Sequence, residues 1–133
     1  MGDLSQHFST KELACPHCGE LQLDPKLVPA LEALRSLAGA PIDVHDAYRC
    51  AVHNKEVGGV PNSEHMTGKA ADVVIEGKSL QEMYNLAVQV PDFLNGGIGV
   101  YDGQFIHVDV RDGKARWSRI AGHYGALDAL VSE

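Results

Sequence analysis

The sequence has no long hydrophobic run and little positive charge. No apolar stretch approaches the roughly 20 residues that a transmembrane helix needs, so we expect no membrane insertion. Eleven Lys and Arg stand against 18 Asp and Glu, giving a formal net charge of −7, and no basic run occurs. Binding to DNA, RNA or an anionic membrane depends on clustered Lys and Arg. We therefore expect no nucleic-acid partner.

The sequence also lacks repeats and low-complexity segments, and we expect no signal peptide. Residues Met1–His7 contain neither a basic stretch nor an apolar core. We expect synthesis in the cytoplasm, and any later export would need help from outside this chain. A length of 133 residues gives room for one domain, residues 1–133, with one hydrophobic core, and we expect a monomer.

Hydrophobic spacing predicts helices first and a small sheet afterwards. Capping boxes at Ser9–Glu12 and Ser79–Glu82 open two helices, and a longer helix runs from Pro25 to Gly39. One or two helical turns are predicted at 51–57. Strands are predicted at 42–45, 70–75, 97–101, 105–110 and 116–117, with a hairpin turn at 102–103. The fold class is α+β, a small mostly antiparallel sheet with flanking helices.

Two segments carry residues typical of a metal site. His65 and Asp72 lie seven residues apart, joined by a turn at Gly68, and His107 lies on a later strand with Asp109 on the same face. Two imidazoles and one carboxylate are suitable ligands for a catalytic zinc that keeps its fourth position for water. Spacing alone leaves the ordinary alternatives open, namely surface or core histidines and an aspartate that satisfies a turn.

Six short motifs together resemble a known family. In order, they are Ala47-Tyr48-Arg49, His53-Asn54, Val57-Gly58-Gly59, the run from Ser63 to Asp72, Gly97-Ile98-Gly99 and His107-Val108-Asp109. They resemble the M15 family of zinc peptidases, the D-alanyl-D-alanine carboxypeptidase-like group, and especially its short single-domain phage and prophage members. The resemblance runs from about Phe8 to Trp117. The Ser63–Asp72 run is highly specific, whereas Gly-Ile-Gly alone is weak.

The resemblance implies a zinc site and a fold. It implies that His65, Asp72 and His107 bind Zn²⁺ in a compact α+β fold of the hedgehog/DD-peptidase type. It further implies that Arg49 contacts substrate and that Ser63, beside the metal loop, does the same. A guanidinium suits a substrate carboxylate because it binds both oxygens in parallel. The alternative for this arginine is a surface pair with a nearby carboxylate, Asp46.

One position departs from the family pattern. Many members carry an acidic general base three residues before the last zinc-binding histidine, where this chain has Gln104. Asp109 is the first candidate to replace it as a catalytic base, and its alternative role is to orient a ligand imidazole. Glu64 is a weaker candidate. His45 could line the cleft, although a structural role is the ordinary expectation.

Three cysteines, an odd number, fit poorly with a disulfide framework. Cys15 and Cys18 form a CxxC motif, and Cys50 and His53 are three residues apart, which matches a second, structural zinc site. A Cys15–Cys18 disulfide or three buried thiols are the alternatives, and a redox CxxC is disfavoured because no βαβ unit surrounds it. The other histidines singled out, His7, His17 and His123, are expected on the surface.

The predicted function is that of a zinc metallopeptidase acting on bacterial peptidoglycan. It would hydrolyse peptide bonds in stem peptides or cross-links, as a carboxypeptidase or an endopeptidase, in phage lysis or wall remodelling. The alternative is a catalytically silent, zinc-containing module that binds the cell wall or serves as a phage structural component.

Overall fold

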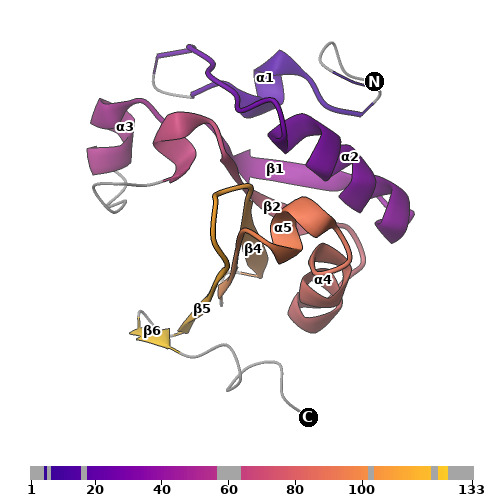
Figure 1. The fold of residues 1–133 in the computed structure, drawn as a ribbon. Coiled ribbons are helices and arrows are strands. Elements are labelled where there is room, and N and C mark those ends of the chain that lie inside the picture. Colours follow the sequence, from indigo (N-terminus) through magenta and orange to yellow (C-terminus); the bar gives the residue numbers. More distant parts are fainter. Residues whose placement is uncertain are drawn as a thin grey trace.

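Six strands form one sheet in the order β1-β2-β4-β3-β5-β6 (Figure 1). The structure, a computed structural model, describes residues 5, 7–15, 18–56, 64–101, 104–120 and 123–125, without the side chains of residues 51, 53, 56, 64, 119, 120 and 123–125. Neighbouring strands are antiparallel except β3 and β5, which are parallel. The strands are β1 (Ile42–Asp46), β2 (Ala70–Ile75), β3 (Gly97–Tyr101), β4 (Phe105–Asp109), β5 (Ala115–Ile120) and β6 (His123–Gly125).

Five α-helices and one 3₁₀ helix accompany the sheet in the described part of the chain. They are α1 (Thr10–Leu13), α2 (Leu27–Ala38), α3 (Ala51–Glu56), the 3₁₀ helix η1 (Glu64–Thr67), α4 (Leu80–Ala87) and α5 (Pro91–Leu94). Figure 1 shows α2, α4 and α5 grouped together and α3 standing apart from them. Within the described residues, no helix combines the length and apolar character needed to cross a bilayer. The α+β prediction is confirmed.

Local signals in the sequence explain where the helices begin and end. The Glu12 carboxylate accepts a hydrogen bond from the Ser9 N–H at 2.9 Å, and the Glu82 N–H donates to Ser79 Oγ at 3.2 Å. Helix α2 ends at Gly39, whose φ of 63° is readily adopted by a residue without Cβ. The sequence did not predict α5, η1 or β6, and β5 is longer than predicted.

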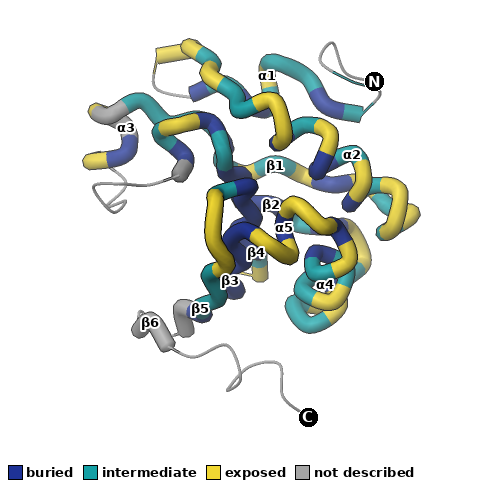
Figure 2. The backbone as a smooth tube through the Cα atoms, in the orientation of Figure 1, coloured by how far each residue is buried: buried dark blue, intermediate teal, exposed yellow. Residues whose placement is uncertain are grey.

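The sheet has an apolar face and a polar face because side chains alternate along each strand. The buried residues of α2, α4 and α5 join the apolar face in one core, which includes Leu31, Met83, Phe93, Val73, Ile98 and Ile106. Figure 2 shows that the central strands are the most buried part of the chain. Asp72, His107 and Asp109 are the residues that alternate with this apolar set, so they lie on the opposite face.

Candidate metal centre

The pairing of β2 with β4 brings two of the predicted ligands together. Asp72 and His107 are direct partners in this antiparallel pair, and the distance from His107 Nδ1 to Asp72 Oδ1 is 3.1 Å. His65, on η1, places its Nε2 3.3 Å from the same carboxylate oxygen. One donor atom from each of the three buried side chains lies within 4.8 Å of the other two.

A glycine fixes the position of η1 against the N-terminal half of the chain. Gly68 has a φ of 73°, and a Cβ at this position would overlap the backbone carbonyl of Gln22. The Gly68 carbonyl accepts a hydrogen bond from the Asp24 N–H at 2.9 Å. The left-handed conformation and the close approach both require glycine here, which accounts for its place between His65 and Asp72.

In each histidine, the ring nitrogen that faces away from Asp72 has a hydrogen-bond partner. His65 Nδ1 is 2.7 Å from the Ala47 carbonyl oxygen, and His107 Nε2 is 2.7 Å from Asp109 Oδ2. Carbonyl and carboxylate oxygens only accept, so these two nitrogens carry protons. The remaining nitrogens, His65 Nε2 and His107 Nδ1, both face Asp72. Such partners orient imidazole ligands in metal sites.

Asp109 is fully buried and its carboxylate accepts several hydrogen bonds. Oδ1 accepts from the Gly97 N–H at 2.8 Å and from Arg111 Nε at 2.9 Å, while Oδ2 accepts from Arg111 Nη2 at 2.7 Å as well as from His107. A Cβ on Gly97 would overlap this carboxylate. Asp109 lies on the side of His107 that faces away from Asp72, and both of its carboxylate oxygens already accept hydrogen bonds. This geometry favours the orienting role of Asp109 over the role of general base.

The same contacts set the charges of the site. Burial raises the pKa of Asp109, but hydrogen bonds from His107 and Arg111 outweigh burial and hold that pKa below its usual range. The pKa of Asp72 is lowered in the same way, with burial opposed by hydrogen bonds to His107 and His65. Burial lowers the pKa of His107, but its hydrogen bonds to Asp109 and Asp72 prevail and raise it to about 9. With this raised pKa, His107 holds a proton on both ring nitrogens at neutral pH. A metal ion held by His107 and Asp72 would replace the proton on His107 Nδ1.

Arg49 lies beside the metal ligands, in the loop between β1 and α3. Its Nε donates to Asp46 Oδ2 at 2.6 Å and its Nη1 donates to Asn54 Oδ1 at 3.0 Å. Nη2 is 3.6 Å from Asp72 Oδ2, and the Arg49 N–H donates to the His65 carbonyl at 3.1 Å. The side chain is only 12% exposed, so the pair with Asp46 is formed but is not a surface pair.

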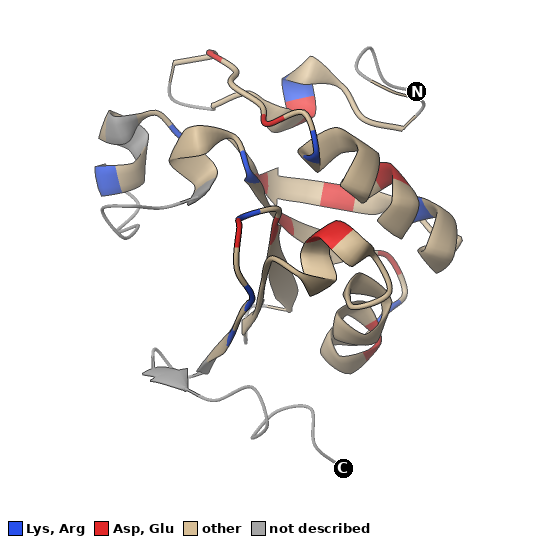
Figure 3. Ribbon diagram, in the orientation of Figure 1, with Lys and Arg blue, Asp and Glu red and all other residues tan. Residues whose placement is uncertain are grey.

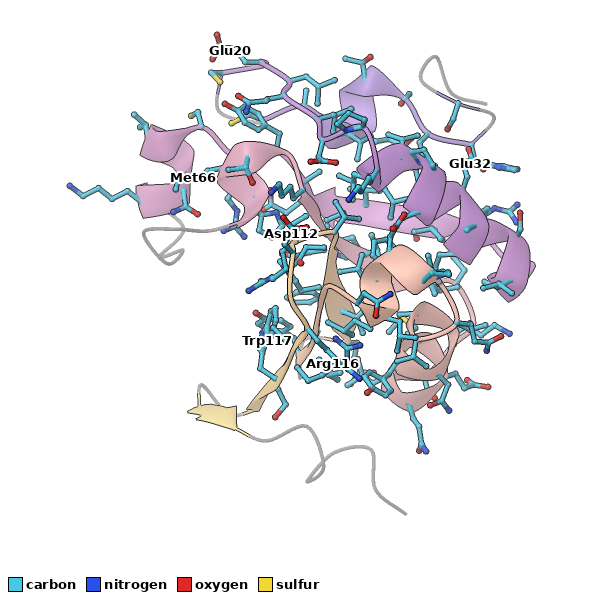
Figure 4. The ribbon with its side chains drawn as sticks, in the orientation of Figure 1. Glu20, Glu32, Met66, Asp112, Arg116 and Trp117 are labelled. Carbon is cyan, nitrogen blue, oxygen red and sulfur yellow. The ribbon has the colours of Figure 1, made fainter. Side chains whose placement is uncertain are left out.

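Trp117 forms an aromatic wall next to the centre. Its ring centroid is 5.0 Å from that of His107, and its Nε1 donates to Tyr101 Oη at 3.0 Å. The indole lies against Gly99, where a Cβ would overlap it. Figure 4 shows Trp117 and Arg116 pointing to opposite sides of β5. The sequence placed Trp117 only in a strand, because nothing in its local pattern marks it as part of a site.

Arg111 is a second functional residue that the sequence analysis missed. It extends the alternation of His107 and Asp109 by two more residues, which was the available signal, and its guanidinium neutralises the buried Asp109. Its Cζ lies 5.3 Å from the Trp117 ring centroid, so it also links the carboxylate to the aromatic wall.

Other predicted residues lie apart from the centre or cannot be placed. Ser63 lies outside the described residues, as do the side chains of Glu64 and His53. Gln104 is exposed and directly precedes β4, in a left-handed conformation with a φ of 66°. His45 lines a surface cavity between α1 and β1, and the residues lining that cavity do not include a metal ligand of the centre.

The three cysteines are also brought together, with their sulfur atoms within 4.8 Å of one another.

Among curated proteins, none matches this chain. The sequence profile of the family described as Peptidase M15 matches residues 6–109, which is well over half of the chain and includes His65, Asp72 and His107. Peptidases of this family are metallopeptidases, in keeping with a buried cluster of metal-binding side chains. The match over this length shows that the chain belongs to the peptidase M15 family.

Proposed function

We propose that this protein is a zinc-dependent peptidase that hydrolyses peptide bonds in bacterial peptidoglycan. The observation that carries the proposal is the convergence of His65 Nε2, His107 Nδ1 and an Asp72 oxygen. Two imidazole nitrogens and one carboxylate oxygen are the donor set of catalytic zinc sites with an open fourth position. Zinc in such a site supplies Lewis-acid activation of water and of the scissile carbonyl.

The residues around the ligands would hold them in place. The Ala47 carbonyl and the Asp109 carboxylate orient the two imidazoles, and Arg111 balances the charge of Asp109. Arg49, held by Asp46 and Asn54, is proposed to direct part of its guanidinium at a substrate carboxylate or carbonyl. Ser63 is proposed as a second substrate contact, on the resemblance alone.

The substrate class rests on the resemblance to the D-alanyl-D-alanine carboxypeptidase-like group. Stem peptides and their cross-links are proposed as substrates, reached in the cell wall or periplasm after release of a monomeric protein, as in phage lysis. Figure 3 shows Lys and Arg interspersed with Asp and Glu over the described elements. This mixture, with a net charge of −7, supports a peptide partner over a nucleic acid.

A second candidate function is a zinc-containing module that binds the cell wall without cutting it. Two observations favour it. Gln104 stands where many relatives have an acidic general base, and the carboxylate of Asp109 is fully committed to His107, Arg111 and Gly97.

Digestion of peptidoglycan separates the two functions. The zinc-loaded protein is incubated with purified peptidoglycan, and new amino and carboxyl termini are identified by mass spectrometry. We expect cleavage by the unaltered protein and by the control variant His45→Ala, and none by His65→Ala/His107→Ala. Sedimentation with the wall in the absence of new termini would establish the binding module. Neither binding nor cleavage would reject both candidates.

A further inference from the structure

Cys15 and Cys18 meet Cys50, from a distant part of the sequence, beside the loop that carries Arg49. Cys15 Sγ is 3.7 Å from Cys50 Sγ, and the Cys18 sulfur lies within 4.8 Å of both. Two thiolates bound to one tetrahedral zinc ion, each at about 2.3 Å, are about 3.8 Å apart. We propose that Cys15, Cys18 and Cys50 bind a second zinc ion, which fastens the N-terminal segment to the Arg49 loop.

Backbone hydrogen bonds join Cys15 to the described residues that follow Cys18, as suits such a site. The Cys15 N–H donates to the Glu20 carbonyl at 2.8 Å, and the Gly19 N–H donates to the Cys15 carbonyl at 2.7 Å. Gly19 has a φ of 75°, which lets the chain reverse directly after Cys18. Figure 4 shows Glu20 at this turn, at the top of the view, and Trp117 well below it. The cysteine cluster is therefore separate from the aromatic wall of the peptidase centre.

Two simpler explanations account for less of this arrangement. Packing in the core explains Cys15, which is buried, but not Cys18, which is exposed and so removes little apolar surface from water. A disulfide has a sulfur–sulfur distance of about 2.05 Å and joins only two cysteines. It would leave the third sulfur unexplained, whereas a metal ion uses all three.

The cluster lies where a bound metal ion would hold two segments of the chain together. The N–H of Tyr48 donates to the Leu13 carbonyl at 3.0 Å, which joins the end of α1 to the segment between β1 and Arg49. Cys50 directly follows Arg49, whose N–H is bonded to the carbonyl of His65. Helix α1 has only four residues, and a helix this short is not stable without tertiary contacts. The zinc ion would lock α1 and the Arg49 loop into one unit.

Cobalt substitution tests the site without relying on peptidase activity. The full-length variant His65→Ala/His107→Ala is loaded with Co²⁺ under reducing conditions. We expect one bound equivalent and the near-ultraviolet charge-transfer absorption of a cobalt–thiolate site. Adding Cys18→Ser should abolish this absorption, and adding Gln22→Ser, an exposed substitution on the same loop, should preserve it. A cobalt-loaded sample without the charge-transfer band would overturn the proposal.

A second measurement uses the unaltered protein and so does not depend on how the variants fold. An organomercurial reagent is added to the zinc-loaded chain, and released zinc is quantified with a colorimetric chelator. We expect release of one zinc equivalent as the three thiols react. Reaction of all three thiols without zinc release would overturn the second zinc site. Either result is independent of whether the protein cleaves peptidoglycan.

Discussion

Asp109 is the residue whose role the contacts define most sharply. It is buried and accepts hydrogen bonds from His107, Arg111 and Gly97. Asp109→Asn removes the charge that orients His107, so we expect zinc affinity to fall about 10–100-fold. Competition with a chelator measures this, and Asp112→Asn, an exposed neighbour, is the control. Full zinc occupancy with kcat reduced by about two to four orders of magnitude would instead make Asp109 the general base.

Arg49 combines a structural and a proposed substrate-binding role. Arg49→Lys keeps the charge but loses the planar fork that bonds Asp46 and Asn54 through two separate nitrogens. We expect a lower kcat/KM and, because the side chain is largely buried, a loss of roughly 1–3 kcal/mol in the free energy of unfolding. Arg35→Lys on α2 is the matched control. A kcat/KM equal to that of the control, together with reduced stability, would show that the arginine is structural only.

At the scale of elements, Glu32 attaches the segment before α1 to α2. Its carboxylate accepts from Ser5 Oγ at 2.5 Å and from the His7 N–H at 2.7 Å, and it lies 2.7 Å from His7 Nδ1. His7 is thus half-buried against this carboxylate, where the sequence predicted a surface position. Figure 4 labels Glu32 on α2.

This attachment should depend on pH. Burial raises the pKa of Glu32, but hydrogen bonds from Ser5 and His7 outweigh burial and lower it. A lowered folded-state pKa means that the stabilisation is complete above the unfolded value of about 4.5 and is lost as the pH falls through the folded value. The Tm of Glu32→Gln should therefore lie below that of the unaltered protein at pH 6 and approach it near pH 3. Glu76→Gln, at an exposed position, should show no such convergence.

Helix α3 carries the proposed fourth ligand of the cysteine site. His53 lies three residues after Cys50, the spacing that completes a Cys₃His donor set. We expect His53→Ala to weaken Co²⁺ binding at the cysteines, seen as a shifted titration of the charge-transfer band. Lys55→Ala on the same helix is the control. An unshifted titration would remove His53 from the site and leave Glu20, 3.6 Å from the Cys18 sulfur, as the next candidate.

At the scale of the whole molecule, the sequence predicted features that depend on local order. The alternation in 105–109 places His107 and Asp109 on one face and Ile106 and Val108 on the other, as the structure confirms. The strands at 70–75 and 97–101 were predicted with the observed bounds, because short, largely apolar runs of this kind are typical of buried strands. His65, Asp72 and His107 were predicted from ligand chemistry and resemblance, and the structure brings them together.

Features that depend on contacts between distant segments were not predictable. The parallel pairing of β3 with β5 places Trp117 opposite Gly99, and no local pattern encodes that neighbour. The Ala47 carbonyl meets His65 from 18 residues away, and a backbone oxygen leaves no sequence signal. The burial of Asp109 was not predictable for the same reason, since it depends on Gly97 and Arg111 packing around the carboxylate.

The position of Trp117 allows its fluorescence to report metal binding. It is the single tryptophan in the chain, and its ring lies 5.0 Å from His107. A protonated imidazole quenches a neighbouring indole more strongly than a neutral one, so zinc binding that displaces the His107 proton should brighten tryptophan fluorescence. The variant His65→Ala/His107→Ala should show no such response. Filling of the cysteine cluster should leave the emission unchanged, so the fluorescence of one residue would distinguish the arrival of the two metal ions.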